Sequence, residues 1–317
     1  MKKTPLVSII IPVYNIEKYI EECLESVRRQ SYTHFECLVI DDCGNDQSIP
    51  RVVKFIQRFE DDRFKILHRF TNGGLSAARN TGIDNACGDY LYFVDGDDKI
   101  FPDALKNLVS VVDKYPDVEI VQGNVMYQEG EAVWHFSEGT FPEYSENREW
   151  IRTQMLRMNI AVSAWNKLYR LDYIRKNKLQ FLEGIINEDV KWCWDNQKLL
   201  SSIAFCSDIC YWYRTDNQAS IMHETDKTRS SISFLIICNQ IKNEINDDLE
   251  IKFIKDCLLH IRVTLNRWAY SKNRKLIRSY LKDMLRDITS SSMRSRCLSL
   301  YILSYIFPFN LYIRIWR

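Results

Sequence analysis

The 317-residue sequence lacks the cysteine pattern of a secreted, disulfide-linked protein. Its ten cysteines are scattered, with no C-x-x-C pair and no regular framework. The first residues, "MKKTPLVSIIIPVYN", contain a short apolar run that leads directly into a predicted strand, with no cleavage site. These absences argue against a secreted disulfide scaffold and predict reduced thiols in the cytoplasm.

A glycine-rich phosphate loop is also missing. Residues 6–13 ("LVSIIIPV") predict a buried strand, but this strand ends in Pro12-Val13-Tyr14-Asn15, where a dinucleotide-binding fold would carry G-x-G-x-x-G. The absence of that cradle argues strongly against an NAD-binding protein.

The charge balance conceals an asymmetry. With 46% apolar residues the chain can bury a real core, and its formal net charge is only +1. Residues 227–317 nevertheless hold 17 Lys+Arg against 7 Asp+Glu, whereas residues 1–226 hold 26 against 35. The acidic and the basic parts are therefore expected to meet different partners.

Apolar runs rich in β-branched residues alternate with segments of helical spacing in the first half. Five such runs predict strands, at residues 6–13, 35–42, 63–68, 89–95 and 118–123. Between the first two, Ile20, Leu24 and Val27 lie on one face of a predicted helix. This alternation predicts an α/β fold with a mostly parallel central sheet flanked by helices, in which ligands bind beyond the carboxyl ends of the strands.

Acidic residues gather at two of those strand ends. The second strand ends in Asp41-Asp42, and the fourth ends in Asp95-Gly96-Asp97-Asp98. Carboxylates this close repel one another unless a cation or hydrogen-bond donors offset their charge. A bound divalent metal is the most specific explanation, although a solvated strand end followed by a helix cap would also account for the acids. Acids at two strand ends beside an aromatic at another suit a nucleotide.

Four ordered motifs carry a family resemblance. "VSIIIPVYNIEKYIEECLESVRRQSYTHFECLVIDDCGND", "GGLSAARNTGI", "YFVDGDD" and "NEDV" resemble the family 2 glycosyltransferases with the GT-A fold, over about residues 5–200. The later "SAWNKLYR", at residues 163–170, is similar to the subset that builds bacterial capsular and surface polysaccharides or lipopolysaccharide. Two departures, Cys43-Gly44 and Gly96, stand where many relatives carry Gly-Ser and Ser.

The resemblance implies roles for individual residues. Pro12 and Tyr14 would lie against the nucleotide base, and Asp41 would accept a hydrogen bond from uracil N3. Asp95 would contact the ribose and the metal, and Asp97 would be the main ligand of Mn2+ or Mg2+. Further implied positions are the donor-pocket residues Arg79 and Asn80, the general base Asp189 with Glu188 as its alternative, and a late metal ligand, His223.

Each implied role has a simpler alternative. Glu188 and Asp189 would also suit a helix N-terminus through the helix dipole alone. Tyr14 would equally serve as a core aromatic, Arg79 as a surface partner of an acid, and His223 as an exposed loop residue. At the level of function, the alternatives are a catalytically silent nucleotide-sugar-binding or assembly protein and a metal-dependent nucleotidyltransferase.

The predicted activity is inverting transfer of a sugar from a nucleotide-sugar donor, expected to be a UDP-sugar, to a hydroxyl of a glycan or lipid-linked acceptor. A metal would stabilise the departing diphosphate, and one carboxylate would take the acceptor proton. We expect no nucleic-acid partner, and a second copy of the chain is a further candidate partner.

The last 90 residues read as a basic helical C-terminal region. We expect a GT-A domain over residues 1–225, with a nucleotide-binding part over about 1–125 and an acceptor part over about 126–225, followed by helices over 226–317. The uncharged stretch from Cys297 to Ile313 is interrupted by Pro308 and falls short of the roughly 20 residues that span a bilayer. An interfacial or re-entrant segment on the anionic inner face of the membrane is therefore predicted, with a core-packing terminal helix as the alternative.

Overall fold

The computed structural model describes residues 4–128, 132–134, 141–221 and 228–264, together with Ser279 and Lys282. The chain divides into two compact units. The first comprises Met1–Gly184 and Glu188–Ala219, and the second comprises Ile185–Asn187 and Ser220–Arg317. The predicted division into a nucleotide-binding and an acceptor part within the first unit stays a prediction.

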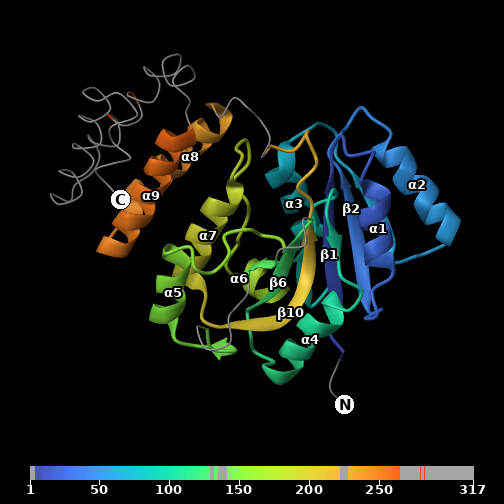
Figure 1. The fold of residues 1–317 in the computed structure, drawn as a ribbon, viewed down its shortest axis with the longest axis horizontal. Helices are drawn as coiled ribbons and strands as arrows, with labels where there is room; N and C mark the ends of the chain where they lie inside the picture. Colours follow the sequence, from blue (N-terminus) through green and yellow to red (C-terminus); the bar gives the residue numbers. More distant parts are fainter. Residues whose placement is uncertain are drawn as a thin grey trace. The chain divides into compact units, whose positions relative to one another are not determined.

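One mixed sheet organises the first unit (Figure 1). In the described residues its main path runs β3-β2-β1-β4-β9-β6-β10-β5, with β7 beside β6 and β8 beside β10. The strands are β1 Val7–Val13, β2 Phe35–Asp41, β3 Phe64–His68, β4 Tyr90–Phe93, β5 Lys99–Ile100, β6 Ile120–Tyr127, β7 Ala132–Trp134, β8 Tyr144–Ser145, β9 Lys167–Arg170 and β10 Ile203–Tyr213.

The α/β fold class is confirmed, and the sheet contains one feature that the sequence did not predict. Strands β1 to β4 pair in parallel, as their βαβ pattern predicts. Strand β9, which arrives late in the chain, then inserts antiparallel between β4 and β6. The parallel arrangement resumes between β6 and β10. The insertion brings the last four residues of the "SAWNKLYR" segment into the centre of the sheet.

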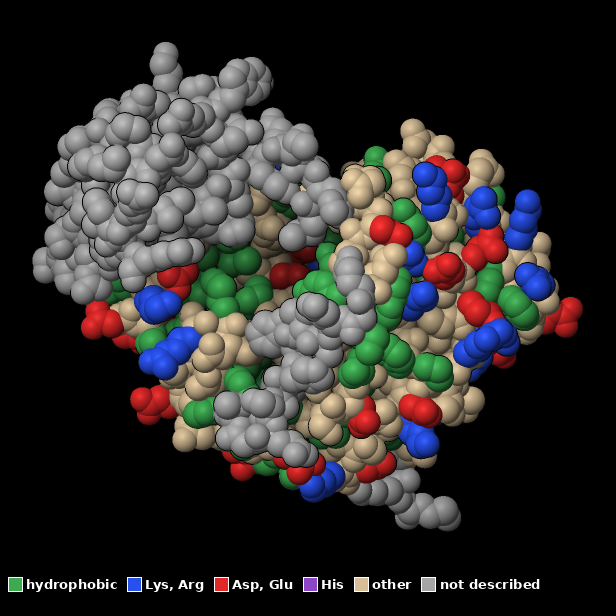
Figure 2. Space-filling view, viewed as in Figure 1, with side chains coloured by type: hydrophobic (Ala, Val, Ile, Leu, Met, Phe, Trp, Pro, Cys, Tyr) green, Lys and Arg blue, Asp and Glu red, His purple; other side chains and the backbone are tan. Residues whose placement is uncertain are grey.

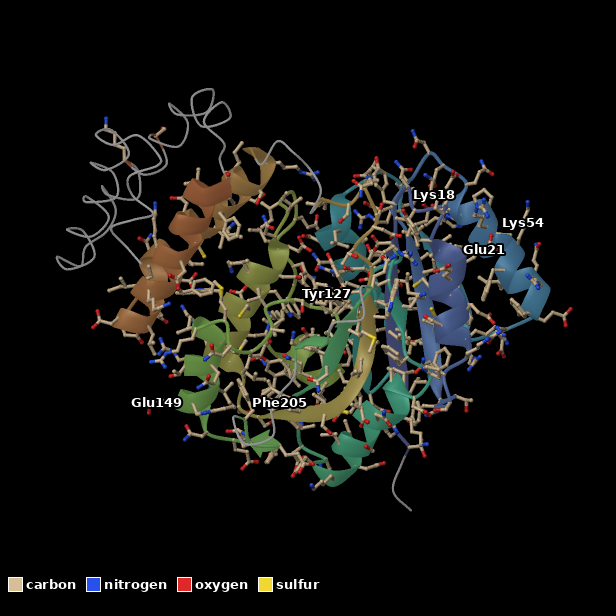
Figure 3. The ribbon with its side chains drawn as sticks, in the orientation of Figure 1. Lys18, Glu21, Lys54, Tyr127, Glu149 and Phe205 are labelled. Atoms are coloured by element: carbon tan, nitrogen blue, oxygen red, sulfur yellow. The ribbon has the colours of Figure 1, made fainter. Side chains whose placement is uncertain are left out.

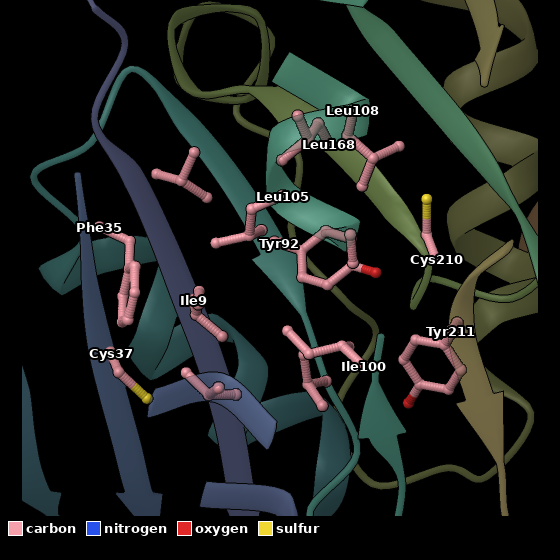
Figure 4. Close-up of a cluster of buried hydrophobic side chains, with 14 of the residues drawn as sticks. Ile9, Phe35, Cys37, Tyr92, Ile100, Leu105, Leu108, Leu168, Cys210 and Tyr211 are labelled. Carbon is pink, nitrogen blue, oxygen red and sulfur yellow. The ribbon is translucent and has the colours of Figure 1, made fainter. Parts of the chain in front are cut away.

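Helices cover both faces of the sheet because alternate strand residues point to opposite sides. On one face, Ile9 of β1 and Cys37 of β2 belong to the same buried cluster as residues of α1 Ile20–Arg28, α2 Ser48–Phe59 and α4 Ala104–Lys114. Figure 4 shows Leu105 and Leu108 of α4 in this cluster with Ile9, Phe35 and Tyr92.

The opposite face carries a second cluster. Ile10 of β1 and Leu38 of β2 pack there with apolar residues of four helices. These helices are α3 Gly74–Asn85, α5 Arg148–Leu156, α6 Leu171–Lys176 and α7 Glu188–Leu199. Helix α3 approaches β1 closely at Gly82, where an added Cβ would lie 2.4 Å from Ile10 Cγ2. This close packing fixes the side chains that α3 presents one turn earlier.

The outer surface of α1 and α2 is highly charged. Figure 2 shows Lys, Arg, Asp and Glu side chains interspersed there, and Figure 3 labels Lys18, Glu21 and Lys54 on this side. Arg51 and Glu21 form an ion pair of 2.9 Å between the two helices. This mixed face is typical of solvent exposure.

The second unit contains α8 Thr228–Ile241, a short 3-10 turn Lys242–Glu244 and α9 Asp248–Thr264. Helices α8 and α9 contact each other, and Leu235, Cys238 and Phe253 are fully buried. The rest of the predicted helical C-terminal region, with the terminal apolar stretch, lies outside the described residues apart from Ser279 and Lys282. Among the described helices, none is long and apolar enough to cross a membrane.

Candidate active site

The loop after β4 is held by β10. The buried carboxylate of Asp98 accepts hydrogen bonds from the Tyr211 hydroxyl at 2.7 Å and from the Arg214 backbone N–H at 2.8 Å. The Tyr211 hydroxyl in turn accepts a bond from the Asp95 N–H at 3.1 Å. Burial, together with the charges of Asp97 and Asp95, raises the pKa of Asp98 well above its ordinary value. Asp98 therefore shapes this loop from within, and it does not face a ligand.

Asp97 points elsewhere. Its carboxylate accepts a bond from the Asn217 amide at 2.7 Å, and Arg214 donates to its backbone carbonyl at 2.6 Å. Burial and the neighbouring Asp95 raise the pKa of Asp97, which means that its negative charge is incompletely offset. Such a carboxylate gains from a nearby cation.

The residues present fit a divalent metal held jointly by protein and substrate. Within the described ranges no three carboxylate, imidazole or thiol groups converge as a closed metal cage. Mg2+ and metals like it commonly bind to one or two carboxylates and complete their shell with water and substrate phosphates. Asp97 and Asp95 are the carboxylates that would supply that partial set of oxygen ligands. His223, the third predicted ligand, lies outside the described residues.

Arg79 connects two motifs that are far apart in the sequence. Its guanidinium donates to Asp95 Oδ1 at 2.8 Å, Glu188 Oε1 at 2.6 Å and Asp189 Oδ1 at 3.2 Å. The side chain is only 1% exposed, so the alternative of a surface ion pair is wrong. Burial by itself lowers the pKa of Arg79, but the charges of Asp95, Asp189 and Glu188 outweigh it and raise that pKa. Arg79 therefore stays cationic and holds the two acid motifs together.

One arginine cannot neutralise three carboxylates. Burial, with the charge of Asp189, raises the pKa of Glu188 to about 7 despite its contact with Arg79. Burial and Asp95 also raise the pKa of Asp189, while Arg79, the Ala164 N–H and Lys167 oppose that rise. The pKa values of both acids at the start of α7 are thus raised, that of Glu188 to about 7. The alternative, in which Glu188 and Asp189 only stabilise the N-terminus of α7 through the helix dipole, does not require this buried network.

The two acids differ in access. The side chain of Asp189 is 22% exposed, whereas that of Glu188 is 6% exposed. An acceptor hydroxyl therefore reaches Asp189 more easily. Asn187, with a left-handed φ of 59°, precedes the pair and turns the chain into α7.

Asn80, next to Arg79, makes structural contacts. Its amide donates to the Phe181 carbonyl at 2.9 Å and to Glu183 Oε1 at 3.1 Å, and its oxygen accepts from the Phe181 N–H at 2.8 Å. These bonds secure residues 181–183, the approach to the acid pair. Its predicted place in the donor pocket stays a prediction.

The predicted nucleotide-base residues lie at the ends of β1 and β2. Pro12 is buried within β1, while Tyr14 is 51% exposed, so its alternative as a core aromatic is wrong. Asp41 accepts from the Cys43 N–H at 3.0 Å and lies 2.8 Å from His68 Nδ1. The side chains of Tyr14 and Asp41 are thus arranged independently of the Arg79 network.

Several residues support the site in roles that the sequence did not predict. Asp42 accepts from the N–H groups of Gly73 and Gly74 at 2.9 and 2.8 Å, which holds the N-terminal end of α3. Tyr211, Arg214 and Asn217 support the Asp95–Asp98 loop from β10 and the residues after it. The segment "YWYRTDNQ" could have indicated Tyr211, Arg214 and Asn217, because polar residues follow a strand there.

The fold and these strand-end acids define a GT-A type glycosyltransferase. The profile of the family described as Glycosyl transferase family 2 matches residues 8–176, more than half of the chain. The chain belongs to this family.

Similar proteins come from bacterial and archaeal sources. EpsH of Bacillus subtilis (strain 168) is 29% identical over 86% of this chain and 80% of its own length. TarS of Staphylococcus aureus (strain MW2), a poly(ribitol-phosphate) β-N-acetylglucosaminyltransferase, is 30% identical over 77% of this chain, which spans only 41% of TarS.

Solved structures share the fold. TarS residues 1–349 in complex with UDP-GlcNAc match with a TM-score of 0.69 at 22% identity, covering 94% of this chain and 86% of that one. The mannosyltransferase PcManGT of Pyrobaculum calidifontis, in complex with GDP-Man and Mn2+, matches with a TM-score of 0.59 at 15% identity, covering 99% and 84%.

Proposed function

We propose that this glycosyltransferase is an inverting, metal-dependent enzyme that moves a sugar from a UDP-sugar to a hydroxyl of a glycan or lipid-linked acceptor. The observation that carries the proposal is the Arg79 network. It links Asp95, in the predicted metal loop, to Asp189, the predicted base. Donor-side and acceptor-side acids are thereby held in one rigid arrangement, as inversion demands.

Asp189 acts as the general base. As the acceptor oxygen bonds to the anomeric carbon, Asp189 takes its proton, and the bond from that carbon to the diphosphate breaks on the opposite side. Glu188 stays close to Arg79 and tunes the charge around the base. A divalent metal, when bound by Asp97 and Asp95, supplies Lewis-acid stabilisation of the diphosphate.

The donor is assigned from two supports. TarS, which shares the fold, binds UDP and UDP-GlcNAc. In this chain, Asp41 offers a carboxylate whose lone pairs remain sufficient to accept the N3–H of uracil, beside the exposed ring of Tyr14. Uracil is therefore the base that this end of the site fits.

The acceptor and the location follow from the charge pattern. The basic residues of 227–317 suit the anionic inner face of a membrane, where a lipid-linked saccharide would be met from the cytoplasm.

The Mn2+ in the mannosyltransferase that shares this fold supports metal dependence.

The test separates donor binding from transfer. We expect Asp97→Asn to weaken Mn2+-dependent binding of UDP in calorimetry by at least about tenfold, because it removes one ligand charge. We expect Asp189→Asn to bind UDP normally but to lower sugar transfer by about 100-fold or more. The exposed Asp62→Asn serves as a control that should change neither. Transfer by Asp189→Asn near the wild-type rate would overturn the assignment of the base, and retention of configuration in the product would overturn inversion.

A further inference from the structure

The carboxylate of Asp41 is held from two sides at the end of β2. The Cys43 N–H donates to its Oδ1 at 3.0 Å, and His68 contacts its Oδ2 through Nδ1 at 2.8 Å. Since a carboxylate only accepts hydrogen bonds, Nδ1 is the nitrogen that carries the hydrogen in this contact. With a partner on each oxygen, the carboxylate cannot rotate without breaking a bond, so its remaining lone pairs keep one direction.

The register of the sheet places His68 beside Asp41. The two residues lie opposite each other in the parallel pair of β2 and β3. The next residue, Arg69, donates its N–H to the Asp41 carbonyl at 3.0 Å, and its own carbonyl accepts from the Cys43 thiol at 2.9 Å. The strand end that carries His68 is therefore bound to the turn that carries Asp41.

The side chain of Arg69 binds the same strand end to helix α3. Its guanidinium forms an ion pair of 2.9 Å with Asp42. It also donates to the Ala77 carbonyl at 2.8 Å and to the Thr81 hydroxyl at 2.6 Å, both within α3. Because Arg69 is bound through its backbone and its side chain, the fold fixes the position of His68 before any ligand arrives.

The pair opens to the surface next to Tyr14. The side chain of Asp41 is 14% exposed and that of His68 is 61% exposed. Val13, the residue before the exposed Tyr14, pairs with Asp41 across β1 and β2. A carboxylate that is held at both oxygens and still open to solvent is a preorganised acceptor for an N–H group of a ligand.

We propose that His68 is a positioning residue of the donor site, which fixes Asp41 for recognition of a base that carries a hydrogen on its ring nitrogen. The proposal rests on the proposed function, in which Asp41 meets the base. Uracil carries this hydrogen at N3, whereas N3 of cytosine is a bare acceptor that a carboxylate repels. His68 does not touch the base in this scheme, and it acts only through Asp41.

The first experiment measures nucleotide binding by the full chain in calorimetry with Mn2+ present. In His68→Asn the amide N–H can replace the imidazole Nδ1–H, whereas His68→Leu removes the donor. We expect UDP affinity to fall about fivefold in His68→Leu and to stay within about twofold of the wild type in His68→Asn. Rescue by the conservative variant separates donation to Asp41 from a simple need for bulk.

The matched control is His34→Leu. His34 directly precedes β2, at the end of the strand opposite Asp41, and its Nδ1 lies 3.2 Å from the Pro5 carbonyl oxygen. UDP affinity should not change in this variant. Unchanged UDP affinity in His68→Leu, or equal losses in His68→Leu and His68→Asn, overturns the role of His68.

CDP shows whether the loss belongs to the base. We expect the wild type to bind CDP more weakly than UDP, and His68→Leu to bind CDP as the wild type does, because the bare N3 gains nothing from Asp41. Equal losses of UDP and CDP affinity in His68→Leu would indicate a general structural role and overturn the proposal.

The second experiment examines the contact between His68 and Asp41 without a nucleotide. Imidazole nitrogens are labelled with 15N and observed by NMR at alkaline pH, where imidazoles are neutral, and the His68 signals are assigned by their absence in His68→Asn. We expect the hydrogen on Nδ1 in the wild type and a shift toward the Nε2–H form in Asp41→Ala. The Nε2–H form in the wild type overturns the contact. Absence of UDP binding by the wild type would refute the proposed donor and with it the base, while the tautomer would still show whether His68 holds Asp41.

Discussion

At the scale of single residues, the site is governed by a shortage of positive charge. Arg79 is shared by Asp95, Glu188 and Asp189, and burial is incompletely offset at Glu188 and Asp189. Removing one partner from such a buried network commonly costs several kcal/mol, because the remaining charges lose their compensation. The same shortage places the pKa of Glu188 at about 7.

This raised pKa predicts a dependence of stability on pH. Because the folded pKa of Glu188, about 7, lies above its ordinary value of 4.5, its contribution to stability is fully present below pH 4.5 and is lost as the pH rises to 7. Between pH 4.5 and 7, the free energy of unfolding of the wild type should fall by up to about 3 kcal/mol more than that of Glu188→Gln. Urea unfolding at pH 5, 6 and 7 measures it.

The exposed Glu143→Gln is the control for this series and should keep the wild-type decline. Parallel pH curves for Glu188→Gln and the wild type would contradict a neutral pKa at Glu188.

At the scale of elements, helix α3 determines the position of the Arg79 side chain. Asp42 holds its N-terminal end through Gly73 and Gly74, and Gly82 lets the helix lie directly against Ile10 of β1. Any side chain at Gly82 would collide with all three outer carbons of Ile10, at 2.4 to 2.9 Å. The close approach therefore decides where Arg79 meets the acids.

We predict that Gly82→Ala destabilises the protein by about 1–3 kcal/mol, because overpacking against buried Ile10 exceeds the gain of up to about 1 kcal/mol in helix propensity. In Ile10→Ala the obstruction is removed, so the double variant should be more stable than the two single effects predict. Denaturant unfolding of all four proteins in a double-mutant cycle measures this coupling. Additive effects would show that α3 and β1 do not meet at this point.

A second element-scale feature concerns Gly96, which lies between Asp95 and Asp97. An added Cβ there would lie 2.3 Å from Ile16 Cδ1 and 3.0 Å from the Pro12 carbonyl oxygen. The turn between Asp95 and Asp97 is therefore packed against the end of β1, which leaves no room for a side chain at position 96.

At the scale of the whole molecule, an acidic part and a basic part share one chain. The 17 Lys+Arg of residues 227–317 exceed their 7 Asp+Glu, and each basic residue near an anionic membrane adds about 1 kcal/mol of attraction. Peripheral attachment needs no spanning helix under these conditions.

We predict that the full chain floats with liposomes containing anionic lipid and that deletion of residues 293–317 releases it. UDP binding should survive the deletion, because the candidate site lies in the first unit. Neutral phosphatidylcholine vesicles serve as the control and should recover less protein. If the full chain fails to float with anionic vesicles, the membrane proposal is wrong.

The sequence by itself determined the local structure and the types of residue at the strand ends. β-branched runs predicted the strands over 6–13, 35–42, 63–68 and 89–95 because alternation and turn chemistry are local properties. The parallel order of these strands places Asp41 and Asp95 at one edge of the sheet, and the resemblance marked Asp97 and Asp189. These features need no knowledge of distant contacts.

Only the tertiary structure decided which of these residues meet. The insertion of β9 between β4 and β6, the three partners of Arg79, and the support of Asp98 by Tyr211 join residues up to 113 positions apart. The neutral pKa of Glu188 likewise depends on burial and on charges from other elements. Propensity and spacing describe neighbours along the chain, whereas desolvation and long-range pairing depend on neighbours in space, and these exist only once the chain has folded.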